Sequence, residues 1–437
     1  MGRYIPASDQ ERQEMLKSMG LSSIDQLYAA VPAQMRVKEL NLPAGLSELE
    51  VRQVMEEMAQ KNTQFSSIFR GAGAYNHYIP SIVKTVTSKE EFVTAYTPYQ
   101  AELSQGILQS IFEYQTMICE LTGMEVSNAS VYDGGSAAAE AVMMCQERKR
   151  SKAVVSGAVN PQVLTTIETY CSSRSVPVQV IPAKDGKTDL EAMAAAIDDT
   201  TACIYFQQPN FYGQIEDGQG LCQMAHEKGC KAIMGVNPIA MGMLQTPGEC
   251  GADIAVGEGQ PLGMSLAFGG PYLGFMASTQ AMMRKLPGRI VGQTTDAKGN
   301  RAFVLTLQAR EQHIRREKAS SNICSNQALC AMTAAVYLAA MGPKGLAECA
   351  HQCYNKAHYA QEKLCQIPGV SLVYTGPYFH EFVTTTPVCS QTVTQKLAEK
   401  GILGGLPVEE GILWCVTEQN SKAQIDALVE AMKEVCA

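Results

Sequence analysis

The chain has 437 residues, and 35 basic against 43 acidic side chains leave a formal net charge of −8. Hydrophobic residues make up 46% of the sequence, which is typical of a folded protein, and the length suffices for two domains. The acidic balance argues against a nucleic-acid-binding protein, because such proteins present a basic face to the phosphate backbone.

Neither a membrane span nor a secretory signal is indicated. No stretch reaches the roughly 18 consecutive uncharged apolar residues that a span needs, and charged residues follow the N-terminus from Asp9 onward. The 15 cysteines are odd in number and contain no C-x-x-C pair, a pattern typical of reduced thiols. We therefore expect a cytoplasmic protein that contacts neither membrane nor nucleic acid.

Residues 1–65 are predicted to form an N-terminal helical arm. Apolar residues recur at helical spacing between Glu48 and Lys61, and Pro32 and Pro43 punctuate the segment. Such an arm can pack on a partner chain or on its own domain, and the sequence leaves both alternatives open.

Residues 66–310 are predicted to form a large α/β domain. Helices are expected over 105–122 and 137–150. After them, the strand candidates are 153–159, 176–182, 202–206, 232–236, 253–256 and 272–277, and helices near 161–173, 188–197 and 218–229 separate several of them. Strands that alternate with helices indicate a mainly parallel sheet covered on both faces.

Residues 311–437 are predicted to form a helical bridge and a small C-terminal α+β domain. The bridge runs from Gln327 to about Cys365 and is interrupted at Pro343. Strand candidates follow at 370–374, 379–385 and 412–416, with helices near 391–400 and 421–435. This order fits the aspartate-aminotransferase-like architecture (fold type I) of pyridoxal-phosphate-dependent transferases, although other doubly wound proteins share it.

A pyridoxal phosphate site requires backbone amides at a helix N-terminus for the phosphate. Gly134, Gly135 and Ser136 precede a predicted helix and are a candidate phosphate cradle, with Ser136 as the helix cap. A simple turn and cap would have the same sequence, so this signal is weak.

The same site requires a lysine for the Schiff base and a carboxylate at the pyridine nitrogen. No lysine or histidine occurs from Ala232 to Arg284. Gln260 and Asn237 stand near the positions where the lysine and the aspartate are expected. An amide forms no imine and does not hold the pyridine nitrogen protonated as a carboxylate does. We therefore predict the scaffold of a pyridoxal enzyme without a working cofactor site.

Four long motifs carry a resemblance to a known family: GAGAYNHYIP, YTPYQAELSQG, FEYQTMICELTG and QAREQHIRREKASSNIC, at 71–80, 96–106, 112–123 and 308–324. They resemble the glycine decarboxylase P-protein family, in the subunit 1 form of bacteria that split this protein into two homologous chains. The resemblance covers essentially the whole chain. It implies an α2β2 assembly in which subunit 2 carries the Schiff-base lysine and pyridoxal phosphate, with the active site near the subunit contact.

The resemblance also implies the reaction. The complex would be a glycine dehydrogenase (decarboxylating): glycine loses its carboxylate on the partner's cofactor, and the aminomethyl group passes to the lipoyl arm of the H-protein, whose disulfide is reduced. Lipoamide is then a co-substrate, and the H-protein is a second partner.

Two clusters are candidate catalytic residues in that assembly. The first, the tyrosine loop, contains Tyr96, Thr97, Tyr99, Gln100 and Glu102. The second, the arginine segment, contains Arg310, His313, Arg315 and Arg316, and arginine forks suit carboxylates. The alternatives are a hydrogen-bonded turn for the loop and a solvated salt-bridge face for the segment.

No metal site is predicted. The densest group of potential ligands is Cys349, His351, Cys353 and His358. We interpret it as a partly buried helix that carries small apolar thiols, although Cys349 and Cys353 can share a helix face.

Three other functions remain open. The chain could be a structural or regulatory pseudo-subunit, or an independent pyridoxal phosphate enzyme that uses an unusual lysine such as Lys285. A hydrolase is the weakest alternative, because the run from Gly263 through Ser265 has Ala267 where a G-x-S-x-G elbow needs glycine.

Overall fold

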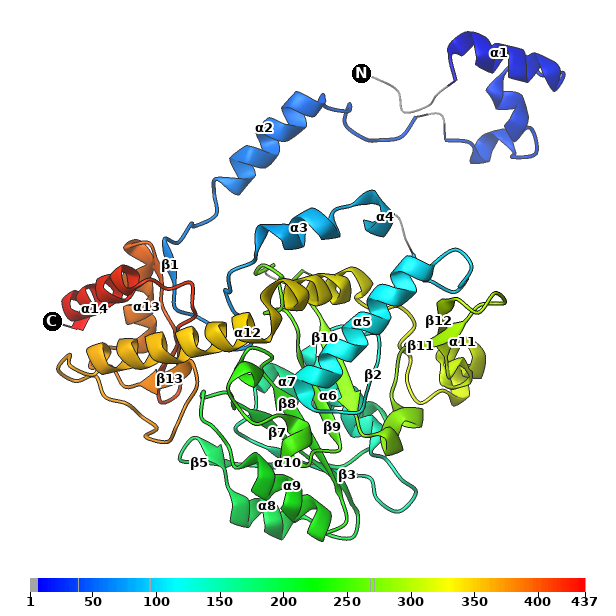
Figure 1. Cartoon of the computed structure of the whole chain (residues 1–437). Helices are drawn as coiled ribbons and strands as arrows, with labels where there is room; N and C mark the ends of the chain where they lie inside the picture. Colours follow the sequence, from blue (N-terminus) through cyan, green and yellow to red (C-terminus); the bar gives the residue numbers. More distant parts are fainter. Residues whose placement is uncertain (1–6, 38, 94–95, 268, 271, 437) are drawn as a thin grey trace. The chain divides into compact units, whose positions relative to one another are not determined.

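The computed structural model describes residues 7–37, 39–93, 96–267, 269–270 and 272–436 (Figure 1). The chain divides into two compact units, with the division between Gln64 and Phe65. The helices of the first unit are α1 (Asp9–Ser18), η1 (Ile24–Tyr28), η2 (Ala33–Met35) and α2 (Glu48–Ala59). Ser8 and Ser47 begin α1 and α2 with capping boxes, and none of the residues of α2 is buried.

A seven-stranded sheet organises the second unit. Its strand order is β2 (Val126–Ser127), β10 (Gly274–Ser278), β9 (Ile254–Glu258), β8 (Lys231–Val236), β7 (Thr201–Gln208), β3 (Lys152–Ser156) and β4 (Val178–Ile181). Neighbours from β9 to β4 pair in parallel, while β10 is antiparallel to both β9 and β2. All six predicted strands of this region are confirmed, whereas β2 was not predicted.

Helices cover both faces of this sheet because successive strand residues point to opposite sides. Val154 and Ile204 belong to the core that contains α5 (Gln105–Thr122) and α9 (Gly218–Glu227). Val155 and Tyr205, the next residues along, belong to the core that contains α6 (Gly134–Met144) and α7 (Pro161–Ser173).

The helix predicted at 137–150 is observed as α6 (Gly134–Met144), so both of its predicted ends are wrong. Helix α6 begins at Gly134, because Asp133 is its N-cap and accepts a hydrogen bond from the amide of Ser136, so Ser136 is not the cap.

The C-terminal region begins with α12 (Ala328–Leu364), which runs in Figure 1 from the sheet to α13 (Ser390–Glu399) and α14 (Lys422–Cys436). Gly342 has φ 61° and ψ 175° just before Pro343, so α12 is two helices joined at the predicted interruption. By length and composition α12 could cross a membrane. Its buried residues, however, belong mostly to the sheet core as far as Cys353 and to the C-terminal core from Ala357 onward, as expected for a core helix.

A three-stranded antiparallel sheet follows, in the order β13 (Glu381–Thr384), β16 (Gly411–Cys415) and β15 (Leu406–Val408). The predicted strand at 370–374 is wrong, because this segment makes a single bridge from Leu372 to Thr384 and then leaves the sheet.

Several short elements complete the second unit. Strand β1 (Ser67–Ile68) pairs in parallel with β14 (Ile402–Leu403), and β11 (Ile290–Thr295) forms a hairpin with β12 (Arg301–Thr306). The others are α3 (Ser81–Thr87), α4 (Glu90–Val93), β5 (Ala183–Lys184), β6 (Lys187–Thr188), α8 (Leu190–Ala196), η3 (Ala240–Gly242), α10 (Pro247–Cys250), η4 (Gln280–Lys285), η5 (Gln308–Arg310), α11 (Gln312–Arg315) and η6 (Arg316–Lys318).

Candidate functional site

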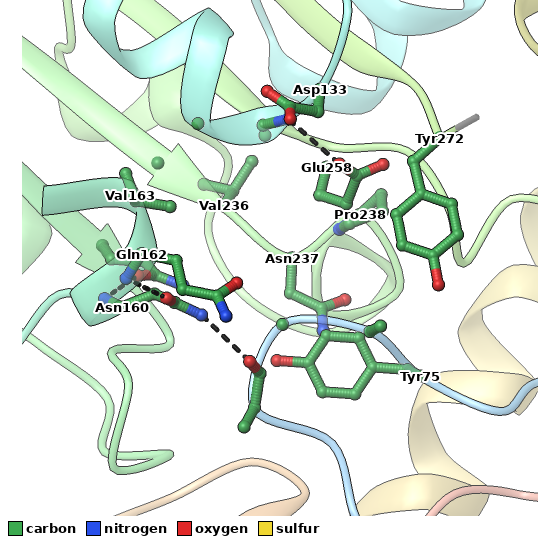
Figure 2. Close-up of a pocket in the computed structure, with 18 of the residues that line it drawn as sticks. Tyr75, Asp133, Asn160, Gln162, Val163, Val236, Asn237, Pro238, Glu258 and Tyr272 are labelled. Carbon is green, nitrogen blue, oxygen red and sulfur yellow. Dashed lines mark hydrogen bonds between the residues drawn. The ribbon is translucent and has the colours of Figure 1, made fainter. Parts of the chain in front are cut away.

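A cavity of about 460 Å³ lies where the carboxyl ends of β8 and β9 meet the N-terminus of α6 (Figure 2). This is the edge of a parallel sheet at which ligands bind in α/β proteins. The segment from Gly71 to Tyr75 lines the opposite wall. Glu381 holds this segment, since its carboxylate accepts hydrogen bonds from the amide of Ala72 (2.7 Å) and the hydroxyl of Tyr75 (2.8 Å).

The candidate phosphate cradle is filled by carboxylates of the chain itself. Glu258 accepts hydrogen bonds from the amides of Gly134 (3.0 Å), Gln260 (2.9 Å) and Leu273 (3.0 Å). Figure 2 shows its side chain beside Asp133, whose carboxylate binds the amide of Ser136 at 2.7 Å. Burial raises the pKa of Glu258 to about 7, although the three amide donors oppose this shift. The N-terminus of α6 is therefore occupied by carboxyl groups of the chain itself where a phosphate would bind.

Gln260 ties two segments together instead of facing the cavity. Its side chain is fully buried. The Oε1 atom accepts a hydrogen bond from the amide of Tyr75 (2.8 Å), and Nε2 donates to the carbonyls of Tyr75 (2.9 Å) and Met264 (2.7 Å). This residue supplies neither an amine nor a free functional group at the cavity.

Asn237 lines the cavity but also has structural partners. Its Oδ1 accepts hydrogen bonds from the amides of Ile239 (2.9 Å) and Ala240 (3.3 Å). Its Nδ2 lies 3.5 Å from Nε2 of His380. Burial, assisted by the charge of His77, lowers the pKa of His380 to about 3, so this imidazole stays neutral.

The residues present do not fit a covalently bound pyridoxal phosphate. None of the described residues that line the cavity is Lys, Arg or His, and Asp133 and Glu258 disfavour a phosphate there. Lys285, the alternative Schiff-base residue, lines a separate cavity with Arg174 and lies 3.9 Å from a carboxylate oxygen of Glu147.

Two members of the predicted catalytic clusters meet around an arginine that the sequence analysis missed. The hydroxyl of Tyr99 accepts a hydrogen bond from Nη2 of Arg289 at 3.1 Å, and its ring packs edge to face with that of His313, with 5.5 Å between ring centroids. Asn326 accepts from Nη1 of Arg289 at 3.1 Å and donates to the hydroxyl of Ser130 at 2.7 Å. We call these residues the Arg289 cluster.

Arg289 is only 3% exposed, and its Nε has no hydrogen-bond partner among the described residues. No described carboxylate forms a salt bridge with it. A buried guanidinium in this state favours an anionic group or a dipole beside it. In the sequence, Arg289 is a single cation directly before β11, and nothing there distinguished it from the other arginines.

The remaining predicted residues fall into two groups. Arg310 faces inward and donates hydrogen bonds to the carbonyls of Leu286 and Gly288, which holds the backbone just before Arg289. Main-chain carbonyls thus accept from both terminal nitrogens of Arg310, and its predicted role as a carboxylate-binding residue stays a prediction. The exposed or half-exposed group consists of Tyr96, Thr97, Gln100, Glu102, Arg315 and Arg316.

The arginine segment does not form the salt-bridge face that was the alternative prediction. Neither Arg315 nor Arg316 forms a salt bridge within the described part of the chain. Glu311 is buried and lies 3.7 Å from Nδ1 of His313. Arg316 has φ 55°, a conformation that costs a non-glycine residue energy and often occurs at functional sites.

Comparisons with known proteins agree on one family. The model of the glycine cleavage system P-protein family matches residues 2–432. A relative from Moorella thermoacetica, named probable glycine dehydrogenase (decarboxylating) subunit 1, is 51% identical and covers 99% of this chain and 100% of its own length. A crystal structure of glycine decarboxylase (P-protein) of the glycine cleavage system, in inhibitor-bound form, has a TM-score of 0.94 at 40% identity, covering 99% of this chain and 100% of that one.

More distant structures show the fold. A sphingosine-1-phosphate lyase from Burkholderia pseudomallei has a TM-score of 0.68 at 15% identity and covers 93% of this chain and 94% of its own. The predicted fold class, pyridoxal-phosphate-dependent fold type I, is confirmed.

Proposed function

This chain belongs to the glycine cleavage system P-protein family as a glycine decarboxylase subunit 1, and we propose that it works only with a homologous subunit 2 that carries pyridoxal phosphate. In the proposed α2β2 complex, located in the cytoplasm, glycine is decarboxylated at the partner's cofactor. The aminomethyl group then passes to the lipoyl arm of the H-protein.

One observation supports the proposal that the partner chain, and not this one, binds the cofactor. At the sheet edge where a fold type I enzyme binds its cofactor, this chain has the buried amide of Gln260, the neutral Asn237 and the carboxylate of Glu258 on the helix N-terminus. Each replaces a group that the cofactor requires. A chain of this family with such a cavity needs a partner to supply the reactive carbonyl.

The surface beside the Arg289 cluster is our candidate for the contact with the partner's active site. Tyr96 is 84% exposed, which is unusual for a large aromatic side chain, and Arg315 and Arg316 are exposed and form no salt bridge with any described residue. Arg289 donates a hydrogen bond to the hydroxyl of Tyr99. We propose that the exposed members bind the substrate carboxylate or order the partner's loops, and that Arg289 is a positioning residue.

The test is reconstitution with the homologous chain encoded beside this one. Both chains are purified separately and together, treated with borohydride, and digested for mass spectrometry, and glycine–bicarbonate exchange is measured. We expect a pyridoxyl adduct on a lysine of the partner and exchange only in the mixture. A stoichiometric adduct on this chain would instead make it an independent pyridoxal phosphate enzyme.

The same preparation distinguishes the pseudo-subunit alternative. If Tyr96→Phe and Arg315→Lys both leave exchange within about threefold of the parent, a direct contribution to the active site is excluded. This chain is then a scaffold or a regulator of subunit 2.

A further inference from the structure

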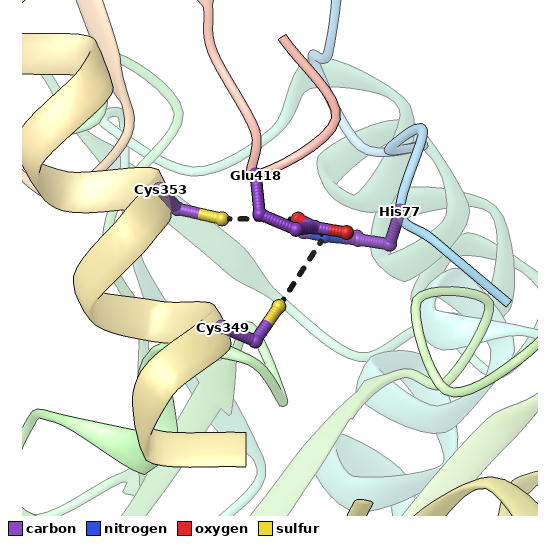
Figure 3. A group of neighbouring side chains, drawn as sticks. All are labelled: His77, Cys349, Cys353 and Glu418. Carbon is purple, nitrogen blue, oxygen red and sulfur yellow. Dashed lines mark hydrogen bonds and ion pairs between the residues drawn. The ribbon is translucent and has the colours of Figure 1, made fainter. Parts of the chain in front are cut away.

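Four potential metal ligands converge where three distant segments of the chain meet (Figure 3). His77 precedes α3, Cys349 and Cys353 belong to α12, and Glu418 follows β16. One ligand atom from each lies within 4.8 Å of all the others. The sequence analysis paired the two cysteines with His351 and His358 and predicted no metal. In the structure, His358 instead stacks on Tyr378 with 4.1 Å between ring centroids.

Helix geometry and burial bring these four side chains together. Cys349 and Cys353 are four residues apart on the second, straight part of α12, so both thiols lie on one face of the helix. They are 4% and 0% exposed, and the side chains of His77 and Glu418 are 2% and 15% exposed. The group is therefore closed to solvent, as the ligands of a structural metal site are.

The donor atoms are spaced almost as a tetrahedral ion requires. Bonds of about 2.0 Å to nitrogen or oxygen and about 2.3 Å to sulfur place neighbouring ligand atoms about 3.3–3.8 Å apart. In the structure Nδ1 of His77 is 2.7 Å from Oε2 of Glu418, Sγ of Cys353 is 3.3 Å from the same oxygen, and Sγ of Cys349 is 4.0 Å from Nδ1 of His77. These three distances lie close to the tetrahedral values, and the other pairs of ligand atoms are within 4.8 Å of each other, so small movements of the side chains reach the tetrahedral arrangement.

We propose that His77, Cys349, Cys353 and Glu418 form a structural zinc site. An imidazole nitrogen, two thiolates and a carboxylate oxygen are ligands that Zn²⁺ takes in proteins, and four protein ligands leave no open position for catalysis. On binding, the two thiols and Nδ1 of His77 release their protons to solvent, and this nitrogen exchanges its contact with Glu418 for a bond to the ion.

The groups around the four ligands suit the net charge that a zinc site of this kind would have. Two thiolates and one carboxylate around Zn²⁺ leave a net charge of about −1. Lys356 lies beside the site, since its ammonium donates a hydrogen bond to the carbonyl of Glu418. The buried Tyr337 hydroxyl interacts with the Cys349 side chain, and burial followed by this interaction raises the pKa of the hydroxyl. A thiolate is a better acceptor for this hydroxyl than a thiol.

A metal at this position would cross-link three segments far apart in sequence. One of them, 71–80, both lines the cavity at the sheet edge and supplies His77. Because the unfolded chain does not hold the four ligands together, zinc stabilises the folded state. This inference does not depend on the proposed function.

The experiment uses the full-length chain, purified under reducing conditions, stripped with a chelator and titrated with zinc or cobalt alone. Zinc content is measured by atomic emission, and cobalt binding by absorption. Cys349→Ser and Cys353→Ser test the site, and Cys324→Ser and Cys389→Ser, at exposed thiols, control for the other cysteines. Circular dichroism checks that each variant folds.

We expect the parent and both control variants to bind about one zinc per chain and to melt at a higher temperature with zinc. Cobalt should show thiolate charge-transfer bands and the intense visible bands of a tetrahedral ion. Each site variant should bind at least about 100-fold more weakly and lose the charge-transfer intensity. Absence of zinc uptake by the parent, or equal uptake by site and control variants, refutes the site. If both site variants fail to fold, Glu418→Gln replaces them with the same criteria.

Discussion

Removing the hydroxyl of Tyr99 should destabilise the isolated chain, whereas removing that of Tyr96 should not. Tyr99 accepts a hydrogen bond from Nη2 of Arg289 at 3.1 Å, and that arginine is 3% exposed with its Nε already unpartnered among the described residues. Tyr99→Phe removes a partner of this buried cation, and because Tyr99 is 47% exposed and water can reach the site, the cost should be about 1–1.5 kcal/mol. Tyr96 is 84% exposed, so Tyr96→Phe should stay within about 0.5 kcal/mol of the parent.

The assay is denaturant unfolding of the full-length chain, with Arg289→Met added to complete a double-mutant cycle. The coupling between positions 99 and 289 should reach about 1 kcal/mol or more. A coupling below about 0.5 kcal/mol, or equal effects of the two tyrosine variants, refutes the Arg289 cluster as a positioning unit. In the assembled enzyme, by contrast, Tyr96→Phe is expected to lower glycine–bicarbonate exchange while the melting temperature stays constant.

Three further predictions follow from other positions. Gln260→Lys alone should give no pyridoxyl adduct after borohydride and should destabilise the chain by about 3 kcal/mol or more, because an ammonium would replace an amide with three buried partners; an imine band in the isolated variant would contradict this. Because the pKa of Glu258 rises to about 7 in the folded chain from 4.5, the parent should lose stability relative to Glu258→Gln as pH increases from 4.5 to 7, by about 3 kcal/mol in total; parallel curves in urea unfolding at pH 5 and 8 would show that the carboxyl does not titrate there. Arg310→Lys should lower the melting temperature, since a lysine cannot bind both main-chain carbonyls, whereas Arg315→Lys should lower exchange by about 30-fold or more at constant melting temperature; the opposite pattern would return Arg310 to the active site.

The sequence pattern alone determined the mainly parallel α/β sheet, because that information is local, whereas the specific fold type also needed the family resemblance. Alternation of short apolar strands with amphipathic helices predicted the six sheet strands from Lys152 to Ser278 within a few residues. The absence of lysine between Ala232 and Arg284 led to the prediction, without any coordinates, that this chain forms no ordinary Schiff base. The strand expected at 370–374 failed because its apolar residues pack as a loop, and pairing with a neighbouring strand is not a local property.

Only the tertiary structure decided which side chains share a site. Glu258 lies 124 residues from the amide of Gly134 that it binds, and Arg289 lies 190 residues from the hydroxyl of Tyr99. The four proposed zinc ligands are likewise spread from His77 to Glu418. Periodicity reports which face of an element is buried, but two buried faces meet only through packing of the whole domain. For that reason the sequence placed Cys349 and Cys353 on one helix face and assigned them the wrong neighbours.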